Sequence, residues 1–147
     1  MKNKILEPGL IRMYNYPLMS KEVRKMFSTL NLMKMKYGNI SLPTITADYE
    51  IKYNCFIRSN GSKVEDYVVK KLTKQENLEE YISYIVSSVQ QLNQEEKIVF
   101  LEYYANDNVD DNIGLKIGCC RDMVIKIRKS AVIKFLTAMG QDEKFLI

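Results

Sequence analysis

The stretch from Asn108 to Gly140 constrains the fold of this chain most strongly, because apolar residues recur in it at helical spacing on both sides of one glycine. Ile113 and Ile117 mark the inner face of a short amphipathic helix. Gly118 suits the end of that helix, since a residue that leaves a helix with positive φ is strained if it carries a Cβ. The second helix has a buried stripe at three- and four-residue spacing: Val124, Ile127, Ala131 and Phe135. The pattern predicts a helix-turn-helix.

This register is similar to that of a known family. Gly114 is expected where the two helices cross closely, and six positions fit the motif together: Ile113, Gly114, Ile117, Gly118, Val124 and Ile127. On these residues the chain resembles region 4 of bacterial sigma factors and the related helix-turn-helix regulators. Residues 92–104 are similar to the supporting helix that precedes the motif in that family, and Ser130-Ala131 and Phe135-Leu136 resemble its end.

Two residues depart from the family pattern. Gly114 stands where alanine is commoner, and Cys120 stands where the family usually places a serine that caps the second helix. A thiol accepts hydrogen bonds poorly, so we expect the second helix to begin less firmly in this chain.

The length of the chain, its earlier helices and the segment from Leu42 to Tyr67 further resemble the ArpU-type regulators of phages and prophages of Gram-positive bacteria. The resemblance implies an all-α fold, with a C-terminal sigma region 4-like helix-turn-helix after an N-terminal helical and irregular extension. It also implies a sequence-specific DNA-binding transcription regulator that activates phage late genes together with host RNA polymerase. The chain has no convincing counterpart of the sigma region that opens promoters, so we do not expect it to initiate transcription alone.

The N-terminal part is expected to be an arm over residues 1–61, with one helix and an extended segment. Pro8-Gly9 and Pro17 interrupt any long helix before Ser20, which is predicted to cap a helix over residues 21–37. Its apolar stripe is Val23, Met26, Phe27, Leu30 and Met33. We favour a core role for this stripe over an adaptable methionine-rich contact surface. Residues 40–60 contain Pro43 and many β-branched and aromatic residues, and are expected to be extended.

Residues 62–147 are expected to form a helical domain that contains the helix-turn-helix at about 109–139. Three capping pairs mark the starts of its earlier helices, because a glutamate three residues after a serine or asparagine can satisfy the cap residue's backbone donor. The pairs are Ser62 with Glu65, Asn77 with Glu80, and Asn93 with Glu96, and the helices should run to about Lys74, Gln90 and Tyr104.

The net charge of +4 is unevenly distributed along the chain. Residues 1–74 carry +8, residues 75–111 carry −8, and residues 112–147 carry +4. A polyanion would be attracted by the ends and repelled by the middle, which favours two surfaces with different partners. Solvated helix faces are the alternative explanation.

Composition excludes several classes of site. The chain has no histidine, and its three cysteines, Cys55, Cys119 and Cys120, include no CxxC pair, so neither a zinc site nor imidazole catalysis is expected. Nucleotide-binding glycine loops and nucleophile elbows are missing, and the paired carboxylates fit helix first turns. We therefore expect no enzyme, no cofactor and no metal.

No apolar run is long enough for a membrane span or a signal peptide, which predicts a cytoplasmic protein in a bacterial host cell without a membrane partner.

If the second helix enters the major groove of double-stranded DNA, its outward residues near the start are the candidate contacts. Arg121 is the expected guanine reader, because its planar fork matches the two guanine acceptors. Lys126 and Lys129 are expected to read bases or bind phosphate. Ile125 either contacts a thymine methyl or packs against the preceding helices, with equal weight. Lys116 and Arg128 are expected phosphate contacts. The full set is Lys116, Cys120, Arg121, Asp122, Ile125, Lys126, Arg128 and Lys129.

The competing interpretation is a helical protein-interaction or assembly module without specific DNA binding. In that case the helix-turn-helix would mediate assembly, and the acidic helices over residues 77–104 would bind a partner. Under either interpretation, RNA polymerase and a second copy of this chain are the protein partners expected. Salt-sensitive binding to DNA distinguishes the two interpretations, because phosphate contacts release counterions and a purely protein contact does not.

Overall fold

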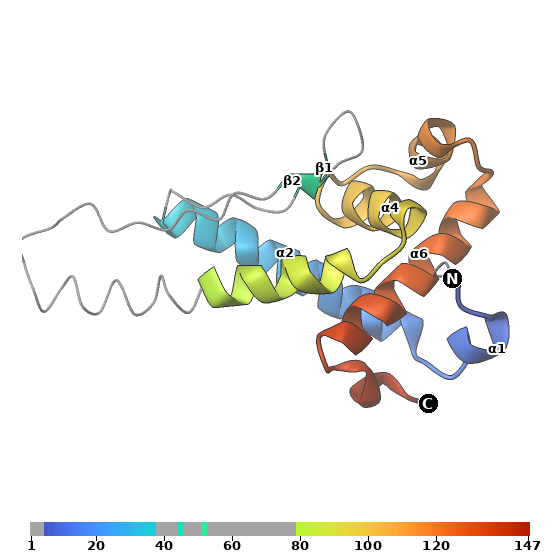
Figure 1. Cartoon of the computed structure of the whole chain (residues 1–147), viewed down its shortest axis with the longest axis horizontal. Helices are drawn as coiled ribbons and strands as arrows, with labels where there is room; N and C mark the ends of the chain where they lie inside the picture. Colours follow the sequence, from blue (N-terminus) through green and yellow to red (C-terminus); the bar gives the residue numbers. More distant parts are fainter. Residues whose placement is uncertain (1–4, 38–43, 46–50, 53–78) are drawn as a thin grey trace, which may run out of the picture.

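The computed structural model describes residues 5–37, 44–45, 51–52 and 79–147 and is mostly helical (Figure 1). Within these ranges the helices are α1 (Pro8–Ile11), α2 (Tyr16–Tyr37), α4 (Gln94–Tyr104), α5 (Asp110–Ile117) and α6 (Arg121–Ala138), with a 3-10 helix η1 (Asp142–Phe145). Residues 79–90 are also helical. Two short antiparallel strands, β1 (Thr44–Ile45) and β2 (Ile51–Lys52), pair Thr44 with Lys52 and Ile45 with Ile51. The expected all-α class is confirmed for this part of the chain.

The start of α4 confirms one of the predicted capping pairs. Asn93 lies at the N-cap, where its Oδ1 accepts a hydrogen bond from the backbone N–H of Glu96 at 2.8 Å. The Glu96 Oε1 atom accepts in return from the backbone N–H of Asn93 at 3.1 Å. Both backbone donors are thereby satisfied, so the helix begins at Gln94.

Helix α2 begins earlier than the sequence predicted. Tyr16 is its first residue, and Ser20 lies inside it rather than at the cap. Pro17 falls in the first turn, where a missing N–H costs no helical hydrogen bond, so this proline begins a helix instead of interrupting one. Ser20 instead turns its hydroxyl inward and is hydrogen-bonded to the hydroxyl of Tyr104 at 2.7 Å.

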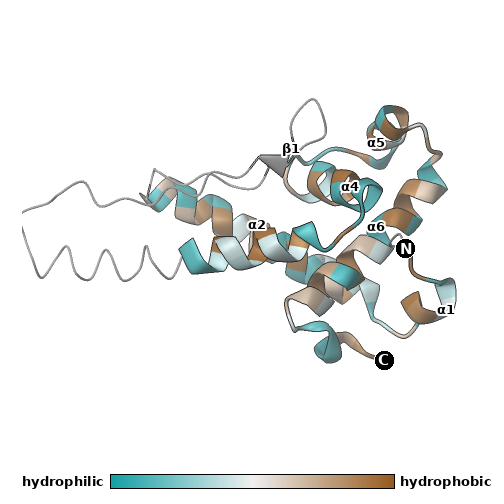
Figure 2. Cartoon of the chain, viewed as in Figure 1, coloured by the Kyte–Doolittle hydropathy of each residue, from teal (hydrophilic) through white to brown (hydrophobic). Residues whose placement is uncertain are grey.

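One main core joins α2 to the helices of the C-terminal half. Met19, Val23 and Leu30 of α2 are fully buried in the same cluster as Phe100 of α4 and Phe135 of α6. Hydrophobic and hydrophilic residues alternate along α2 and α6 (Figure 2), whereas α4 is buried over most of its length. Helix α2 is therefore not part of a separate arm, and the expected boundary at residue 61 does not divide this core.

The two ends of the described chain lie together. The backbone N–H of Asn15 donates to the Phe145 carbonyl at 2.7 Å, and the N–H of Ile147 donates to the Met13 carbonyl at 2.9 Å. Both ends lie on the same side of the molecule (Figure 1). The N-terminal segment is thus fastened to the C-terminal tail as well as to α6.

Several sequence predictions fall outside the described residues. These are the helix over residues 63–74, the capping pair of Ser62 and Glu65, the cap at Asn77, and Cys55. The two strands lie in the segment expected to be extended, and the helical residues 79–90 end at Gln90 as predicted.

Candidate nucleic-acid interface

Over the residues of the predicted helix-turn-helix, the structure has α5, a short turn and α6. Gly118 ends α5 in the left-handed conformation, with φ of 73° and ψ of 34°, and its N–H donates to the Gly114 carbonyl. The N–H of Cys119 donates to the same carbonyl at 2.9 Å, so the last turn of α5 closes on itself. Backbone conformation alone favours glycine at position 118, because no atom of the described residues beyond its chain neighbours lies within 4 Å of the place a Cβ would take.

Gly114 is required for a different reason. A Cβ built at this position would lie 2.5 Å from the carbonyl oxygen of Cys119 and 3.4 Å from a methyl group of Val124. The close approach predicted here is confirmed, but its main neighbour is the backbone of the turn rather than the second helix. The glycine thus permits the sharp return of the chain from α5 into α6.

Four fully or nearly fully buried residues hold the motif together, and we call them the small cluster: Val99, Ile113, Val124 and Ile127. They come from α4, α5 and α6, so the supporting helix packs on both helices of the motif. Ile117 is partly buried against the same cluster. Its α6 members share one helix face with Ala131 and Phe135, which confirms the predicted stripe.

The face of α6 opposite the small cluster remains open over its first two turns. Cys120, Arg121, Asp122 and Lys126 are exposed, and Ile125 and Lys129 are partly buried. Cys120 is the N-cap residue of α6 and makes no side-chain capping bond, as its thiol predicted. Lys129 has its ammonium 5.6 Å from the centre of the Tyr16 ring. Six of the eight predicted contact residues therefore gather on one surface.

Arg128 is the clear correction to the predicted set. We expected it on the surface as a phosphate contact, but its side chain is only 9% exposed. Its guanidinium pairs with the Asp110 carboxylate, donates to the Tyr16 hydroxyl at 3.0 Å and lies 3.9 Å from the centre of the Tyr103 ring. Burial alone would lower the pKa of Arg128, but Tyr16 and Asp110 raise it, so the group stays charged. Arg128 fastens α6 to α5, α4 and α2.

Lys116 also takes part in an internal contact. Its Nζ donates to Glu102 Oε2 at 2.9 Å and joins α5 to α4, although 45% of the lysine side chain is exposed. Burial alone would raise the pKa of Glu102, but hydrogen bonds from Lys116 and Asn106 hold it below its usual value. The charge of Lys116 is therefore partly neutralised, which weakens its expected role as a phosphate contact.

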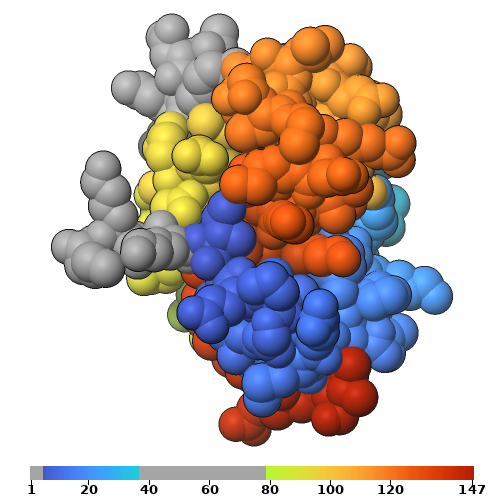
Figure 3. All heavy atoms as spheres, turned by 90° about the vertical axis from the view of Figure 1, so that its right-hand side faces the viewer, coloured from blue at the N-terminus to red at the C-terminus, as the bar shows by residue number. Residues whose placement is uncertain are grey.

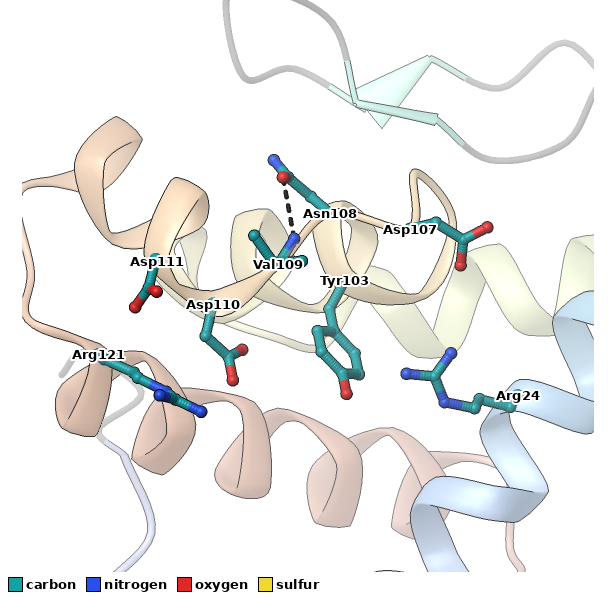
Figure 4. A pocket seen from close by; sticks show the side chains of 8 residues that line it. All are labelled: Arg24, Tyr103, Asp107, Asn108, Val109, Asp110, Asp111 and Arg121. Atoms are coloured by element: carbon teal, nitrogen blue, oxygen red, sulfur yellow. Dashed lines mark hydrogen bonds between the residues drawn. The ribbon is translucent and has the colours of Figure 1, made fainter.

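A pocket of about 390 Å³ lies on one side of α6, between the start of α5 and α2 (Figure 4). We call this side the acidic flank, because three carboxylates line it beside two arginines. Arg121 and Arg24 lie at opposite ends of the pocket, with Asp110 and Tyr103 between them (Figure 4). Its lining residues are Arg24, Tyr103, Asp107, Asn108, Val109, Asp110, Asp111 and Arg121.

A second pocket, of about 530 Å³, lies between the N-terminal segment and α6. We call this side the basic flank, because Arg12, Lys126 and Lys129 line it around an apolar floor. The N-terminal segment and the first turns of α6 lie on the same face of the molecule (Figure 3). The surface around the open face of α6 is thus electrostatically asymmetric.

Sequence reasoning missed Arg12 and Arg24 as neighbours of α6. Arg24 lines one pocket with Arg121 of α6, 97 positions later, and Arg12 lines the other with Met123, 111 positions later. Neither arginine belongs to a motif. No local pattern connects them to the helix-turn-helix, so only the tertiary structure brings them to this surface.

The structure gives two further findings on other classes of site. Over the described ranges, no three or more cysteine or carboxylate side chains are placed to hold a metal ion. None of the helices in those ranges combines the length and the apolar character that crossing a membrane requires.

Comparisons with protein-family models, with curated proteins and with solved structures found no match.

Proposed function

We propose that this protein is a sequence-specific DNA-binding transcription regulator that inserts the first two turns of α6 into the major groove. The observation that carries the proposal is the open face of α6, where Arg121, Asp122 and Lys126 are exposed opposite Val124 and Ile127. A reading helix needs this division, because one face must reach base edges while the other is held rigidly. The resemblance to ArpU-type regulators supports the activation of phage late genes with host RNA polymerase as the biological role.

The support for α6 is consistent with that use. Glu96 of α4 is fully buried, and its carboxylate accepts hydrogen bonds from Ser130 at 2.5 Å and from Lys134 at 3.0 Å. Arg128 fastens the same helix to Asp110 and Tyr16. These contacts fix the position of α6 relative to α4 and α5, so base contacts would form without reorganising the helix.

The first experiment measures affinity for DNA as salt is varied. Binding sites would be selected from random duplexes with the full chain, and affinity for the selected site and for scrambled DNA would be measured over a range of salt. Lys126→Ala should weaken both and lower the salt slope by about one unit if one phosphate contact is lost. Lys144→Ala is the matched control, because Lys144 is also exposed but lies in η1, beyond the far end of α6. Equal affinities and slopes for both variants and the parent would remove Lys126 from the contact set.

Substitutions of Arg121 distinguish the recognition of a specific base from general electrostatic attraction to DNA. Arg121→Ala should lose roughly 1 to 3 kcal/mol on the selected site and less on scrambled DNA, because the remaining cations still attract phosphate. Arg121→Lys keeps the charge but loses the planar fork, so it should restore little of the specific affinity. Equal losses on both DNAs would make Arg121 a phosphate contact, and no loss on either would favour the protein-interaction interpretation.

A protein-interaction surface beside the proposed DNA contacts has one specific support. Glu79, Glu80 and Glu95 are exposed. Tyr84, which lies in the same helix as Glu79 and Glu80, is 52% exposed. Glu96 and Glu102 belong to the same acidic stretch but are buried in internal ion pairs, so they are not available to a partner. The acidic helix over residues 79–90 is the surface we propose for RNA polymerase. Loss of polymerase binding in Glu79→Lys/Glu80→Lys, with DNA affinity retained, would support this surface.

A further inference from the structure

The basic flank has the chemistry of a binding surface for a polyanion with apolar edges. Its rim carries Arg12, Lys126 and Lys129, and Glu7 is the acidic residue among its lining. Met123 of α6 is 38% exposed beside it. The apolar lining comes from both walls: Ile5, Leu6, Pro8, Ile11 and Met123.

The N-terminal segment that forms one wall is fixed to α6. The backbone N–H of Leu6 donates to Ser130 Oγ at 2.9 Å, and Ser130 in turn donates to the buried Glu96 carboxylate. Ile5 packs against the small cluster. The backbone N–H groups of Leu10 and Ile11 donate to the Glu7 carbonyl and form α1. Arg12 is the residue that caps α1, so its backbone is already placed beside α6 and only its side chain would be ordered on binding.

The acidic flank is a poor place for a DNA strand. In helix-turn-helix proteins the helix before the turn commonly crosses the DNA backbone, and backbone N–H groups at a helix start favour phosphate. Here α5 begins with Asp110 and Asp111, and Asp107 lies close to them. Arg128 compensates Asp110, but Asp111 is exposed and would repel a phosphate. Phosphate contacts at the start of α5 are therefore weakened by the negative charge of the acidic flank.

We propose that the N-terminal segment is a DNA-backbone clamp, in which Arg12 binds a phosphate beside α6 and Ile11 and Met123 contact the adjoining deoxyribose. This inference rests on the proposed function. A helix in the major groove has one DNA phosphate backbone along each of its sides. A protein segment that packs beside this helix therefore lies next to one of the two DNA strands. A sugar-phosphate strand combines anionic oxygens with apolar sugar edges, and the basic flank matches both. Lys129 and Lys126 add positive charge on the α6 wall.

The test compares Arg12→Ala with the parent chain and with Lys144→Ala on the selected site and on scrambled DNA. We expect Arg12→Ala to lose affinity roughly tenfold on both DNAs near 0.1 M salt and to lower the salt slope by about one unit. Lys144→Ala should match the parent. An unchanged slope and affinity for Arg12→Ala, or a loss confined to the selected site, would overturn the clamp.

A second measurement does not depend on the stability of the variant. A photo-crosslinking side chain introduced at position 12 of the full chain should crosslink to bound DNA, and the same group at position 144 should not. No crosslink from position 12, while Lys126→Ala still weakens binding, overturns the clamp and leaves the proposed function standing. If the parent chain shows no salt-dependent DNA binding at all, both the proposed function and the clamp are overturned.

Discussion

The main core and the small cluster differ in size and in how they are reinforced. The main core joins α2, residues 79–90, α4 and α6, and it contains the buried rings of Phe100 and Phe135, which are tilted by 37° with their centroids 4.7 Å apart. The small cluster has four fully or nearly fully buried residues beneath the helix-turn-helix. Polar contacts supplement it: Arg128 with Asp110, and Lys116 with Glu102. Apolar burial therefore holds the main core together, whereas the geometry of α5, the turn and α6 also depends on a few polar contacts and on two glycines.

Helix α6 passes through both regions. Val124 and Ile127 belong to the small cluster, and Ala131 and Phe135 belong to the main core. A rigid helix that is anchored in the larger region can hold its exposed first turns in place. Damage to the main core should therefore reach the motif, whereas damage to the small cluster should stay more local.

The largest effect is expected from Phe135→Ala. Truncating this fully buried ring removes its contacts and leaves a cavity, which should lower the free energy of unfolding by about 3 to 5 kcal/mol. Chemical denaturation measures the loss, and amide exchange should rise in α4, α5 and residues 79–90 together. Faster exchange confined to one of these helices would show that the two regions unfold independently.

Arg128→Met should cost about 3 kcal/mol, because it leaves the Asp110 carboxylate without its buried partner. The double variant Arg128→Met/Asp110→Asn should recover part of the loss, since it removes the uncompensated charge. Denaturation of the two single variants and the double variant measures this coupling. Additive losses would contradict the coupling of Arg128 to Asp110.

Gly118→Val should cost roughly 1 to 2 kcal/mol, because a β-branched residue tolerates a φ of 73° badly. Gly118→Asn is the matched control, since asparagine adopts this conformation with less strain. Melting temperature and DNA affinity should fall for the first variant more than for the second. Equal melting temperatures and affinities for both variants and the parent would mean that this turn does not constrain the motif.

Local patterns in the sequence predicted those features that local chemistry determines. The reciprocal cap of Asn93 and Glu96, the positive φ of Gly118 and the stripe through Val124 and Ile127 each follow from residues within one or two helical turns. Arg128 was assigned wrongly because its partners Tyr16, Tyr103 and Asp110 come from three other helices or segments. A helical wheel of α6 alone cannot show that α2 and α5 cover this position.

The structure of the N-terminal part also depends on its tertiary context. Pro17 reads as a helix breaker when only its missing donor is considered, yet the first turn of a helix tolerates it. The hydrogen bond from the Leu6 backbone N–H to Ser130 Oγ joins residues 124 positions apart, so no local sequence pattern predicts it. The same holds for Arg12, which lines one pocket with residues of α6. The α6 residues of the surface that we propose for DNA, apart from Met123, were therefore predictable from the sequence, whereas the part contributed by residues 5–12 required the tertiary structure.

The smallest effect is expected from the ion pair between Glu102 and Lys116, and it should depend on pH. The pKa of Glu102 is lower in the folded chain than in the unfolded chain, so its contribution to stability is present above its usual pKa of 4.5 and is lost as the pH falls through the folded value. Glu102→Gln keeps the shape and the acceptor for Asn106 but loses the charge. Because water reaches the lysine, we expect a loss below about 1 kcal/mol near neutral pH. Denaturation of both proteins from about pH 7 to about pH 3 should show this difference shrinking toward zero at the acid end. A difference that stays constant over this range would mean that hydrogen-bond geometry, and not the charge of Glu102, joins α4 to α5.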